Sequence, residues 1–325
     1  MNVCDAKKEL NLVIQIPCFN EEETLAKTLN DLPVQLQGVS DIKVLIIDDG
    51  SEDRTGEIAR KHGCQIVRHT RNAGLARAFT TGIETALGME ADIIVNTDAD
   101  NQYDASCIQD LIQPILDGKA EMVIGERPIH SIESFSWMKK KLQSLGSFAV
   151  RKLSGTAVKD APSGFRAFSR FAAEQLNVFN AYTYTLETLI QAGRRQIPVV
   201  SVPVRVNRVK RPSRLIKSIP SYVYRSLKTM LRVFVLYKPM RFFFALGSVL
   251  IFIGMIPGVR FLYFYFIGQG TGKIQSLIFM AVMILAGLLC YMVGLITDLI
   301  AVNRRLLEDI RVEVRRSRRD GKKDT

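Results

Sequence analysis

Residues 11–204 alternate short apolar runs of strand length with longer segments whose apolar residues recur at helical spacing. Strands that alternate with helices in this way are typical of a mainly parallel sheet covered by helices on both faces. We therefore predict an α/β domain over 1–204. The expected strands are Leu12–Ile16, Val44–Ile47, Gln65–Val67, 93–97 and Met122–Gly125. The expected helices are one after Asn20, one that stops near Gly63, one at 75–89 and one at 105–117.

The first helix has a specific start signal. Asn20 is a residue type that caps helices, and Glu23 stands three residues later, where a capping box has its acidic residue. Leu25, Leu29 and Leu32 then follow at helical spacing. We therefore expect a helix that begins at Asn20 and continues through these leucines.

The C-terminal part of the chain contains two long runs that lack charge. Phe242–Val259 is an uncharged run of 18 residues, and as a helix it covers roughly 27 Å, close to the hydrocarbon thickness of a bilayer. Arg260 and several aromatic residues follow it, as expected near a membrane interface. Leu277–Thr297 is the second run. We expect a hairpin of two transmembrane helices within 242–302, spanning about 242–264 and 276–300.

The net charge of +12 is concentrated beside these runs. Residues 205–241 hold 11 Lys and Arg and no Asp or Glu, and residues 303–325 hold 9 Lys and Arg against 5 Asp and Glu. Basic residues gather on the cytosolic side of membrane proteins and are attracted to anionic lipids. We therefore expect basic amphipathic helices over 205–241 at the membrane surface, and a basic cytosolic tail over 303–325. Both termini and the α/β domain are then cytosolic, in a multi-pass protein of the inner or plasma membrane.

The basic segments have two other interpretations. Residues 205–241 could instead form a solvated, charged helix of the α/β domain. Nucleic-acid binding is the other partner class typical of a basic chain, but it does not explain the adjacent apolar runs. We therefore expect anionic membrane lipids as partners and no nucleic acid.

The first apolar run contains a Gly-x-x-x-Gly spacing at Gly254 and Gly258. This spacing permits two helices to approach closely. Pro257 lies inside it, so a local kink is an equally good interpretation. The spans could also support a homo-oligomer, and the sequence leaves both points open.

Polar clusters follow three of the expected strands. They begin at Pro17, Asp48 and Asp98. Ligands of open α/β sheets bind at the carboxyl ends of the strands, so these clusters are expected to converge on one crevice. Asp98 and Asp100 can both reach one small cation, and Mg²⁺ or Mn²⁺ typically takes a couple of carboxylates and fills its other positions with phosphate oxygens and water. This arrangement suits a nucleotide diphosphate, although an isolated Asp-x-Asp is more often a polar turn.

Together these clusters resemble the family-2 glycosyltransferases with the GT-A fold, a Rossmann-like architecture. Pro-x-Phe/Tyr-Asn-Glu, Asp-Asp-Gly-Ser and Asp-x-Asp form the opening signature of that family. The segment Asp160–Arg166 is similar to the acceptor-loop motif of the polyprenyl-phosphate branch, and Arg208–Leu215 is similar to that branch's Arg-x-x-Gly-x-Ser-Lys-Leu segment. The resemblance covers about residues 10–240 and is closest to dolichyl-phosphate mannose synthases and bacterial undecaprenyl-phosphate glycosyltransferases.

The resemblance implies a role for each matching residue. The catalytic residues would be Asp160, Arg127 and Arg208, with the two arginines meeting the diphosphate or the acceptor phosphate. The nucleotide-sugar site would comprise Pro17, Phe19, Asn20, Glu21, Asp49 and Asp98. The metal ligands would be Asp98, Asp100 and Gln102. The acceptor site would comprise Ser163, Gly164, Arg166 and Arg214.

The chain also departs from the family pattern. Phe19 replaces the commoner Tyr, so a hydroxyl contact is lost. Arg214 replaces Lys, and Arg211 stands where Gly is usual. These departures leave the class intact but weaken any inference about the sugar and the lipid.

The resemblance implies a membrane glycosyltransferase that moves a sugar from a UDP- or GDP-linked donor to a polyprenyl phosphate with inversion. A divalent cation and Arg127 would stabilise the departing diphosphate. Asp160 would act either as a base or as a positioning group, and both interpretations stay open. The alternatives are a non-catalytic membrane scaffold that binds nucleotide sugars and a processive polysaccharide synthase. The synthase would need more spans and a Gln-x-x-Arg-Trp motif, whereas the only tryptophan, Trp137, follows Phe135-Ser136.

Overall fold

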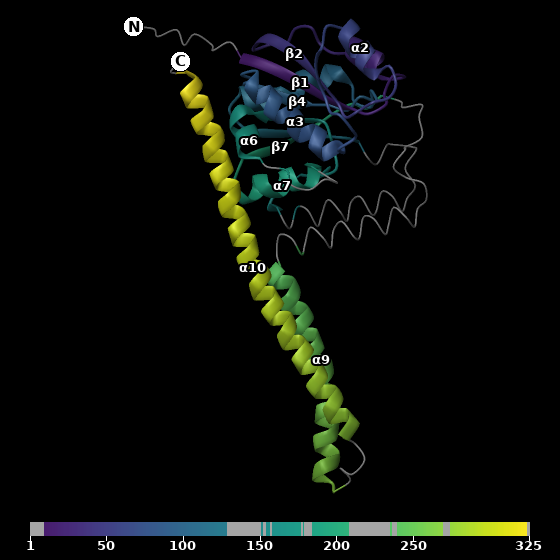
Figure 1. The fold of residues 1–325 in the computed structure, drawn as a ribbon, viewed down its shortest axis with the longest axis vertical. Helices are drawn as coiled ribbons and strands as arrows, with labels where there is room; N and C mark the ends of the chain where they lie inside the picture. Colours follow the sequence, from purple (N-terminus) through teal and green to yellow (C-terminus); the bar gives the residue numbers. More distant parts are fainter. Residues whose placement is uncertain are drawn as a thin grey trace. The chain divides into compact units, whose positions relative to one another are not determined.

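The computed structural model divides the chain into two compact units, Met1–Val223 and Tyr224–Thr325. The residues that the structure describes are 10–128, 151, 154–156, 158–176, 178, 184–207, 235, 239–268 and 274–323. Most of the predicted juxtamembrane segment, 205–241, therefore lies outside the described residues. Figure 1 shows the α/β unit and the two long C-terminal helices, α9 and α10, and each unit is described by itself below.

The described part of the first unit contains one seven-stranded sheet in the order β3-β2-β1-β4-β6-β5-β7. The strands are β1 (Leu10–Cys18), β2 (Val39–Asp48), β3 (Gln65–Arg68), β4 (Ile93–Asn96), β5 (Met122–Glu126), β6 (Arg166–Ser169) and β7 (Val199–Pro203). All neighbouring pairs are parallel except those made by β6, which runs antiparallel to β4 and to β5. The predicted α/β architecture with a mainly parallel sheet is confirmed.

β1 lies at the centre of the part of the sheet that carries the polar clusters. It pairs with β2 on one side and with β4 on the other, and Ile14 is in register with both Val44 and Val95. β1 is a nearly continuous apolar run, which is typical of a strand buried on both faces. Because these three strands are parallel, their carboxyl ends and the polar loops that follow lie at one edge of the sheet.

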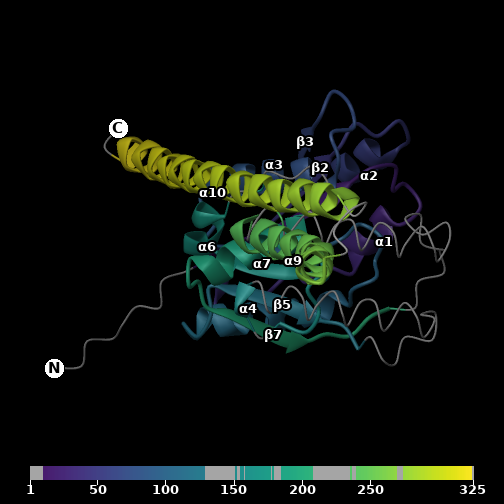
Figure 2. The ribbon, with the colours of Figure 1, turned by 90° about the horizontal axis from the view of Figure 1, so that it is seen from below.

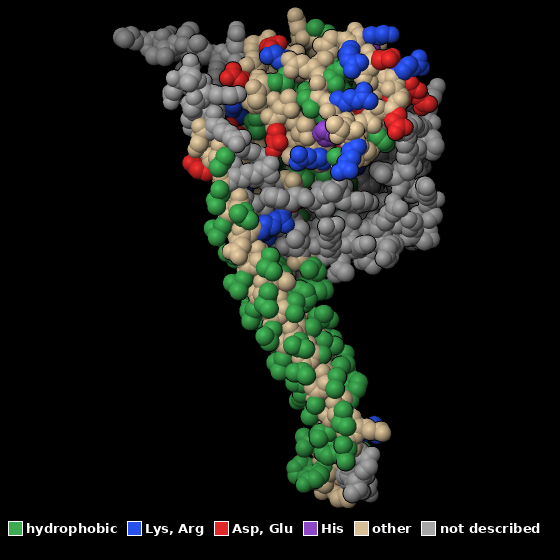
Figure 3. All heavy atoms as spheres, in the orientation of Figure 1, with side chains coloured by type: hydrophobic (Ala, Val, Ile, Leu, Met, Phe, Trp, Pro, Cys, Tyr) green, Lys and Arg blue, Asp and Glu red, His purple; other side chains and the backbone are tan. Residues whose placement is uncertain are grey.

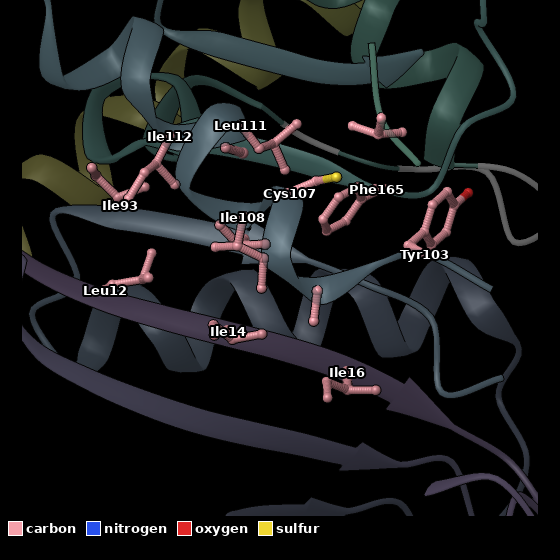
Figure 4. Packing of buried hydrophobic residues seen from close by; sticks show 14 of the residues in the cluster. Leu12, Ile14, Ile16, Ile93, Tyr103, Cys107, Ile108, Leu111, Ile112 and Phe165 are labelled. Carbon is pink, nitrogen blue, oxygen red and sulfur yellow. The ribbon is translucent and has the colours of Figure 1, made fainter. Parts of the chain in front are cut away.

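Helices cover both faces of the sheet. They are α1 (Leu25–Asn30), α2 (Thr55–Lys61), α3 (Leu75–Gly88), a 3-10 turn η1 (Ala105–Cys107), α4 (Ile108–Leu116), α6 (Arg170–Gln175) and α7 (Tyr184–Arg194). On one face, Leu12, Ile14 and Ile16 of β1 pack in one cluster with Ile108 and Leu111 of α4 (Figure 4). α3 packs against β1 and β2 and contacts α6 and α7. Figure 2 shows α4 next to β5 and β7, the two strands at that end of the sheet.

The predicted start of the first helix, at Asn20, is wrong. Asn20 has a positive φ of 53° and lies five residues before α1, which begins at Leu25 and ends at Asn30. The amide oxygen of Asn20 accepts a hydrogen bond from Glu52 N, so the group that was expected to cap the helix instead joins two loops. Leu32 lies beyond the end of the helix. Local spacing alone could not reveal this contact between loops 32 residues apart.

The second unit contains two long helices, α9 (Pro239–Phe266) and α10 (Ile274–Lys323). By length and composition, α9 and the segment Ile274–Arg304 of α10 can each cross a membrane. Hydrophobic side chains cover the surface of both segments, as Figure 3 shows. α10 continues as a helix to Lys323, so the described part of the predicted tail belongs to the same helix as the second span.

Glycines allow α9 and α10 to pack backbone to backbone. A Cβ placed on Gly247 would lie 2.7 Å from the carbonyl oxygen of Gly287, and a Cβ on Gly287 would lie 2.8 Å from that of Gly247. Gly254 and Gly258 lie against the side chains of Met283 and Met280 of α10, where an added Cβ would also be too close. The close-approach interpretation of the Gly-x-x-x-Gly spacing is therefore confirmed.

Candidate active site

The loops after β1 and β2 are joined by a set of hydrogen bonds. Asn20 N donates to Ser51 Oγ at 3.0 Å, Glu52 N donates to Asn20 Oδ1 at 2.9 Å, and Glu21 N donates to Thr55 Oγ1 at 2.9 Å. The positive φ of Asn20 turns the first loop toward the second. A hollow of about 310 Å³ lies between these loops and is lined by Asn20, Glu22, Glu23, Glu52 and Asp53. The first two polar clusters therefore form one surface at the carboxyl edge of the sheet.

Asp49 fixes a third loop against this surface. Its carboxylate accepts hydrogen bonds from Ala73 N at 2.9 Å and Gly74 N at 2.8 Å, and it contacts His69 Nδ1 at 2.7 Å. Gly50 packs on the backbone of the same loop, where a Cβ would lie 2.8 Å from the carbonyl carbon of Arg71. Asp49 therefore positions the segment between β3 and α3. A contact between Asp49 and a nucleotide stays a prediction.

Asp98 follows β4 and differs from the other acidic residues of the site. Among the residues that the structure describes, its carboxylate makes no hydrogen bond, although it is half-buried. Its pKa is raised to about 7, first by burial and then by the neighbouring carboxylate of Asp100, and the guanidinium of Arg127 offsets part of this shift. Two carboxylates this close to each other repel when both are ionised, so the pair favours either a proton or a cation.

The loop that carries Asp98 and Asp100 is held by the first helix. Thr28 Oγ1 of α1 donates to Ala99 O at 2.9 Å, and Asp100 Oδ1 accepts from Gln102 N at 3.0 Å. No group of three or more His, Cys, Asp or Glu side chains suited to a metal occurs in the described ranges. A cation here would therefore take few protein carboxylates and complete its shell with substrate oxygens and water, which is the habit of Mg²⁺. Asp98 and Asp100, two neighbouring carboxylates in one loop, fit such an ion.

Arg127 and Asp160 form a buried ion pair beside Asp98. Arg127 Nε donates to Asp160 Oδ2 at 2.7 Å and Nη2 donates to Oδ1 at 3.0 Å. Asp160 has no exposed surface, and 11% of the Arg127 side chain is exposed. Burial alone would lower the pKa of Arg127, but Tyr103 and Asp160 raise it above its ordinary value. The cation at this point of the site is therefore permanent, and both oxygens of Asp160 are used to hold it.

Arg166 has a different position from the one that the resemblance implied. It is fully buried, and it donates to Ser163 O, Ala161 O, Thr185 O and Thr188 Oγ1 at 2.7–2.8 Å. Burial lowers its pKa to about 10. Direct contact between Arg166 and an acceptor phosphate does not fit this geometry, because its guanidinium is enclosed and already bonded. Arg166 instead braces the acceptor loop, which we define as residues 160–166.

Ser163 and Gly164 of the acceptor loop are also buried. Its exposed member is Pro162, and the exposed Lys159 precedes the loop. Lys159 Nζ lies 3.6 Å from Glu126 Oε1, at the end of β5. The loop is therefore a packed element of the site whose buried residues set its shape.

Two polar residues that the sequence analysis missed hold this loop. Tyr103 is 4% exposed, and its hydroxyl accepts a hydrogen bond from Gly164 N at 3.1 Å. Asn96, at the end of β4, donates from Nδ2 to Gly164 O at 2.8 Å and accepts at Oδ1 from Gln15 Nε2 at 2.8 Å. Asn96 had a usable signal, since it is a polar residue at the end of an otherwise apolar buried strand. Tyr103 had none, because a buried tyrosine is a common core residue.

The chain segment that leads to Arg208 lies against the loop after β4. Val206 forms a β-bridge with Tyr103, and Asn207 N donates to Gln102 O at 2.8 Å. Arg208 and Arg214, predicted to bind phosphate, lie outside the described residues. Their roles stay predictions, and so do those of Pro17, Phe19 and Glu21 toward a nucleotide.

Residues 13–176 match the family described as glycosyl transferase family 2. The chain belongs to this family. A UDP-N-acetylglucosamine–dolichyl-phosphate N-acetylglucosaminyltransferase from Methanococcus voltae is 33% identical over 214 residues, which cover 58% of this chain and 83% of the relative. An undecaprenyl-phosphate mannosyltransferase from Micrococcus luteus is 26% identical over 200 residues, which cover 58% of this chain and 80% of the relative.

A solved structure has a fold similar to that of the first unit. It is a glucosyl-3-phosphoglycerate synthase from Mycobacterium tuberculosis in complex with Mn²⁺, UDP and glucosyl-3-phosphoglycerate. It matches with a TM-score of 0.52 and 19% identity, covering 68% of this chain and 80% of that one. At this identity the likeness shows the fold alone, and it confirms the GT-A fold predicted for this glycosyltransferase.

Proposed function

We propose that this family-2 glycosyltransferase moves a sugar from a nucleotide-diphosphate sugar to a polyprenyl phosphate, inverting the anomeric carbon. The observation that carries the proposal is the position of Asp98. Its carboxylate makes no hydrogen bond to the described residues, and it lies beside Asp100 and beside the Arg127–Asp160 pair, at the edge of the sheet where donor ligands bind. The names of the polyprenyl-phosphate-dependent relatives and the two membrane-length helices support a lipid acceptor.

Asp98 and Asp100 would hold the divalent cation, with Gln102 close by in the same loop. A bound Mg²⁺ or Mn²⁺ would act as a Lewis acid on the diphosphate. The Mn²⁺ in the solved neighbour supports a divalent ion, and the choice between the two metals belongs to the proposal. Arg127 adds a fixed positive charge beside these carboxylates and stabilises negative charge on the leaving group.

Asp160 is proposed as a positioning group. Both of its oxygens accept hydrogen bonds from Arg127, so the carboxylate is already committed. A phosphate monoester has a second pKa near 6 and is largely dianionic at neutral pH, so attack by its oxygen hardly needs a base. Orientation of Arg127 is therefore the role that the hydrogen bonds support.

The membrane arrangement is part of the proposal. We infer a multi-pass protein of the inner or plasma membrane, with the catalytic unit and both termini in the cytosol and with anionic lipids near its basic segments. A homo-oligomer assembled through the spans is consistent with this arrangement.

The experiment uses the full chain purified in detergent or nanodiscs. It is incubated with a panel of UDP- and GDP-sugars, undecaprenyl or dolichyl phosphate, and Mn²⁺, Mg²⁺ or EDTA, and the lipids are weighed by mass spectrometry. We expect one donor to give a polyprenyl-phosphate sugar only when a divalent cation is present. Donor binding without any lipid product would favour a non-catalytic scaffold, and a growing polysaccharide would favour a processive synthase.

A further inference from the structure

Gly164 is held by side chains from outside its own loop. Its N–H donates to the hydroxyl of Tyr103 at 3.1 Å, and its carbonyl accepts from Asn96 Nδ2 at 2.8 Å. Asn96 is the last residue of β4 and precedes Asp98 in the chain. Tyr103 follows Asp98, in the loop after β4. Both backbone polar groups of one acceptor-loop residue are therefore bonded to the segment that carries the proposed metal ligands.

Gly164 also touches Asp98 directly. A Cβ on Gly164 would lie 2.9 Å from Asp98 Oδ2 and 3.0 Å from Oδ1, closer than real Cβ contacts. The loop can approach the carboxylate this closely because residue 164 has no side chain. The distance between the acceptor loop and Asp98 is thus set at Gly164.

Tyr103 has other contacts besides its hydrogen bond to Gly164. Its backbone pairs with Val206, and its carbonyl is 3.4 Å from Asn207 Nδ2. Its ring stacks on Phe165 at a centroid distance of 4.9 Å and an interplanar angle of 20°, as Figure 4 shows at the edge of the core. The hydroxyl therefore has a defined position.

Hydrogen bonds from Arg166 connect the residues of the acceptor loop to one another. Arg166 bonds to the carbonyls of Ala161 and Ser163 within the loop, so a displacement at Gly164 is passed to its neighbours. Asp160 directly precedes Ala161 and holds Arg127. A shift at Gly164 would therefore change the relation between Arg127 and Asp98.

We infer that Tyr103 is a positioning residue for the proposed transfer, and that its hydroxyl, together with the amide of Asn96, keeps the acceptor loop in register with Asp98. This inference rests on the proposed function. In this inference Tyr103 contacts neither substrate. It affects how the polyprenyl phosphate is used as acceptor by holding Gly164 in place. Burial raises the pKa of Tyr103 to about 12, so the hydroxyl stays protonated over the working range of pH.

The test compares the full-length wild type with Tyr103→Phe, which keeps the ring stacked on Phe165 and removes only the hydroxyl. Steady-state transfer is measured while donor and polyprenyl phosphate are varied separately, and binding of UDP or GDP with Mn²⁺ is measured by calorimetry. We expect the KM for the lipid to rise about tenfold, which corresponds to 1.4 kcal/mol. We expect the KM for the donor and the nucleotide affinity to stay within about twofold, since one neutral hydrogen bond is lost away from the donor loops.

Two further variants sharpen the test. Asn96→Ser removes the other hydrogen bond to Gly164, together with the bonds of Asn96 to Gln15 and to the Tyr184 hydroxyl. It should give the same split between the two KM values, so it decides the question if Tyr103→Phe does not fold. Tyr291→Phe is the matched control, because the hydroxyl of Tyr291 lies 2.8 Å from Ser248 Oγ between α9 and α10. It should leave both KM values unchanged.

The outcomes separate this inference from the proposed function. A wild type that forms no lipid-linked sugar with any donor overturns the proposed function, and this inference with it. A wild type that is active while Tyr103→Phe behaves like Tyr291→Phe overturns only the role of Tyr103. An equal loss for donor and acceptor would also overturn that role, because it would indicate general disruption.

Discussion

Arg127 and Asp160 lie 33 residues apart in the chain and are joined by two side-chain hydrogen bonds of 2.7 and 3.0 Å. Arg127 follows β5, and Asp160 opens the loop that leads into β6. A two-point contact between a guanidinium and a carboxylate fixes the orientation of both groups. The pair therefore fixes the positively charged guanidinium of Arg127 near Asp98.

We expect Asp160→Asn to lower both stability and transfer. The change removes one partner of a buried ion pair and leaves the other charge buried, which typically destabilises a protein by about 3–5 kcal/mol. Thermal melting of the purified full chain and the rate of product formation would measure the two effects. Asp117→Asn is the matched control, because Asp117 pairs with the exposed Lys119 at 2.8 Å and exposed pairs contribute at most about 1 kcal/mol. Equal losses in the two variants would contradict a special role for the Arg127–Asp160 pair.

Asp98→Asn should remove cation binding without lowering the stability of the metal-free protein. The raised pKa means that ionised Asp98 is disfavoured in the folded state, so at pH 8 a neutral side chain of the same shape removes an unfavourable charge. We expect Mn²⁺ with a nucleoside diphosphate to raise the melting temperature of the wild type and to leave that of Asp98→Asn unchanged, because ligands stabilise the state that binds them. A variant that still responds to Mn²⁺ like the wild type would argue against Asp98 as a ligand.

Gly164→Ala should impair the reaction through one added methyl group. A Cβ at this position would press on both oxygens of Asp98 and would lie 3.0 Å from the hydroxyl of Tyr184. Overpacking of this kind typically destabilises by about 1–3 kcal/mol. We expect transfer to fall at least tenfold, as measured by lipid product formed per minute. Gly88→Ala, at the end of α3, should have full activity, because within 4 Å the added carbon would meet no described atom beyond its neighbouring residues and the backbone of its own helix.

Gly247→Val should loosen the hairpin of α9 and α10. The new side chain would meet the carbonyl of Gly287 and the ring of Tyr291, each at 2.7 Å from its Cβ. We expect a lower melting temperature in detergent, and Ala245→Val, at an exposed position two residues earlier, should melt like the wild type. Unchanged melting of Gly247→Val would mean that the two helices separate at little cost.

The sequence was informative wherever local pattern decides the outcome. The apolar runs of β1, β2 and β4 are recognisable because parallel strands buried on both faces need continuous apolar residues. Their shared direction then brings the clusters at Asn20, Ser51 and Asp98 to one edge. The glycine spacing around Gly254 permitted a close helix contact, which the structure has, but Pro257 left a kink as an equally good interpretation of the sequence.

The sequence could not reveal contacts that depend on chain segments meeting in space. Asn20 looked like a helix cap, but its side chain bonds to the loop after β2. Arg166 looked like a phosphate ligand, because a motif identifies the residue type and does not show that four acceptors from its own chain surround it. Tyr103 could not be singled out, since the significance of its hydroxyl depends on Gly164, 61 residues later.

The reversed direction of β6 has a consequence for how the two substrates can meet. Asn96 at the end of β4 is in register with Arg166 at the start of β6, so the chain enters β6 at the same edge where it leaves β4. A parallel strand of four residues would have delivered the segment before Arg166 to the opposite edge, roughly 13 Å away. One inverted strand thus brings two stretches of chain, separated by some sixty positions, face to face at one edge of the sheet.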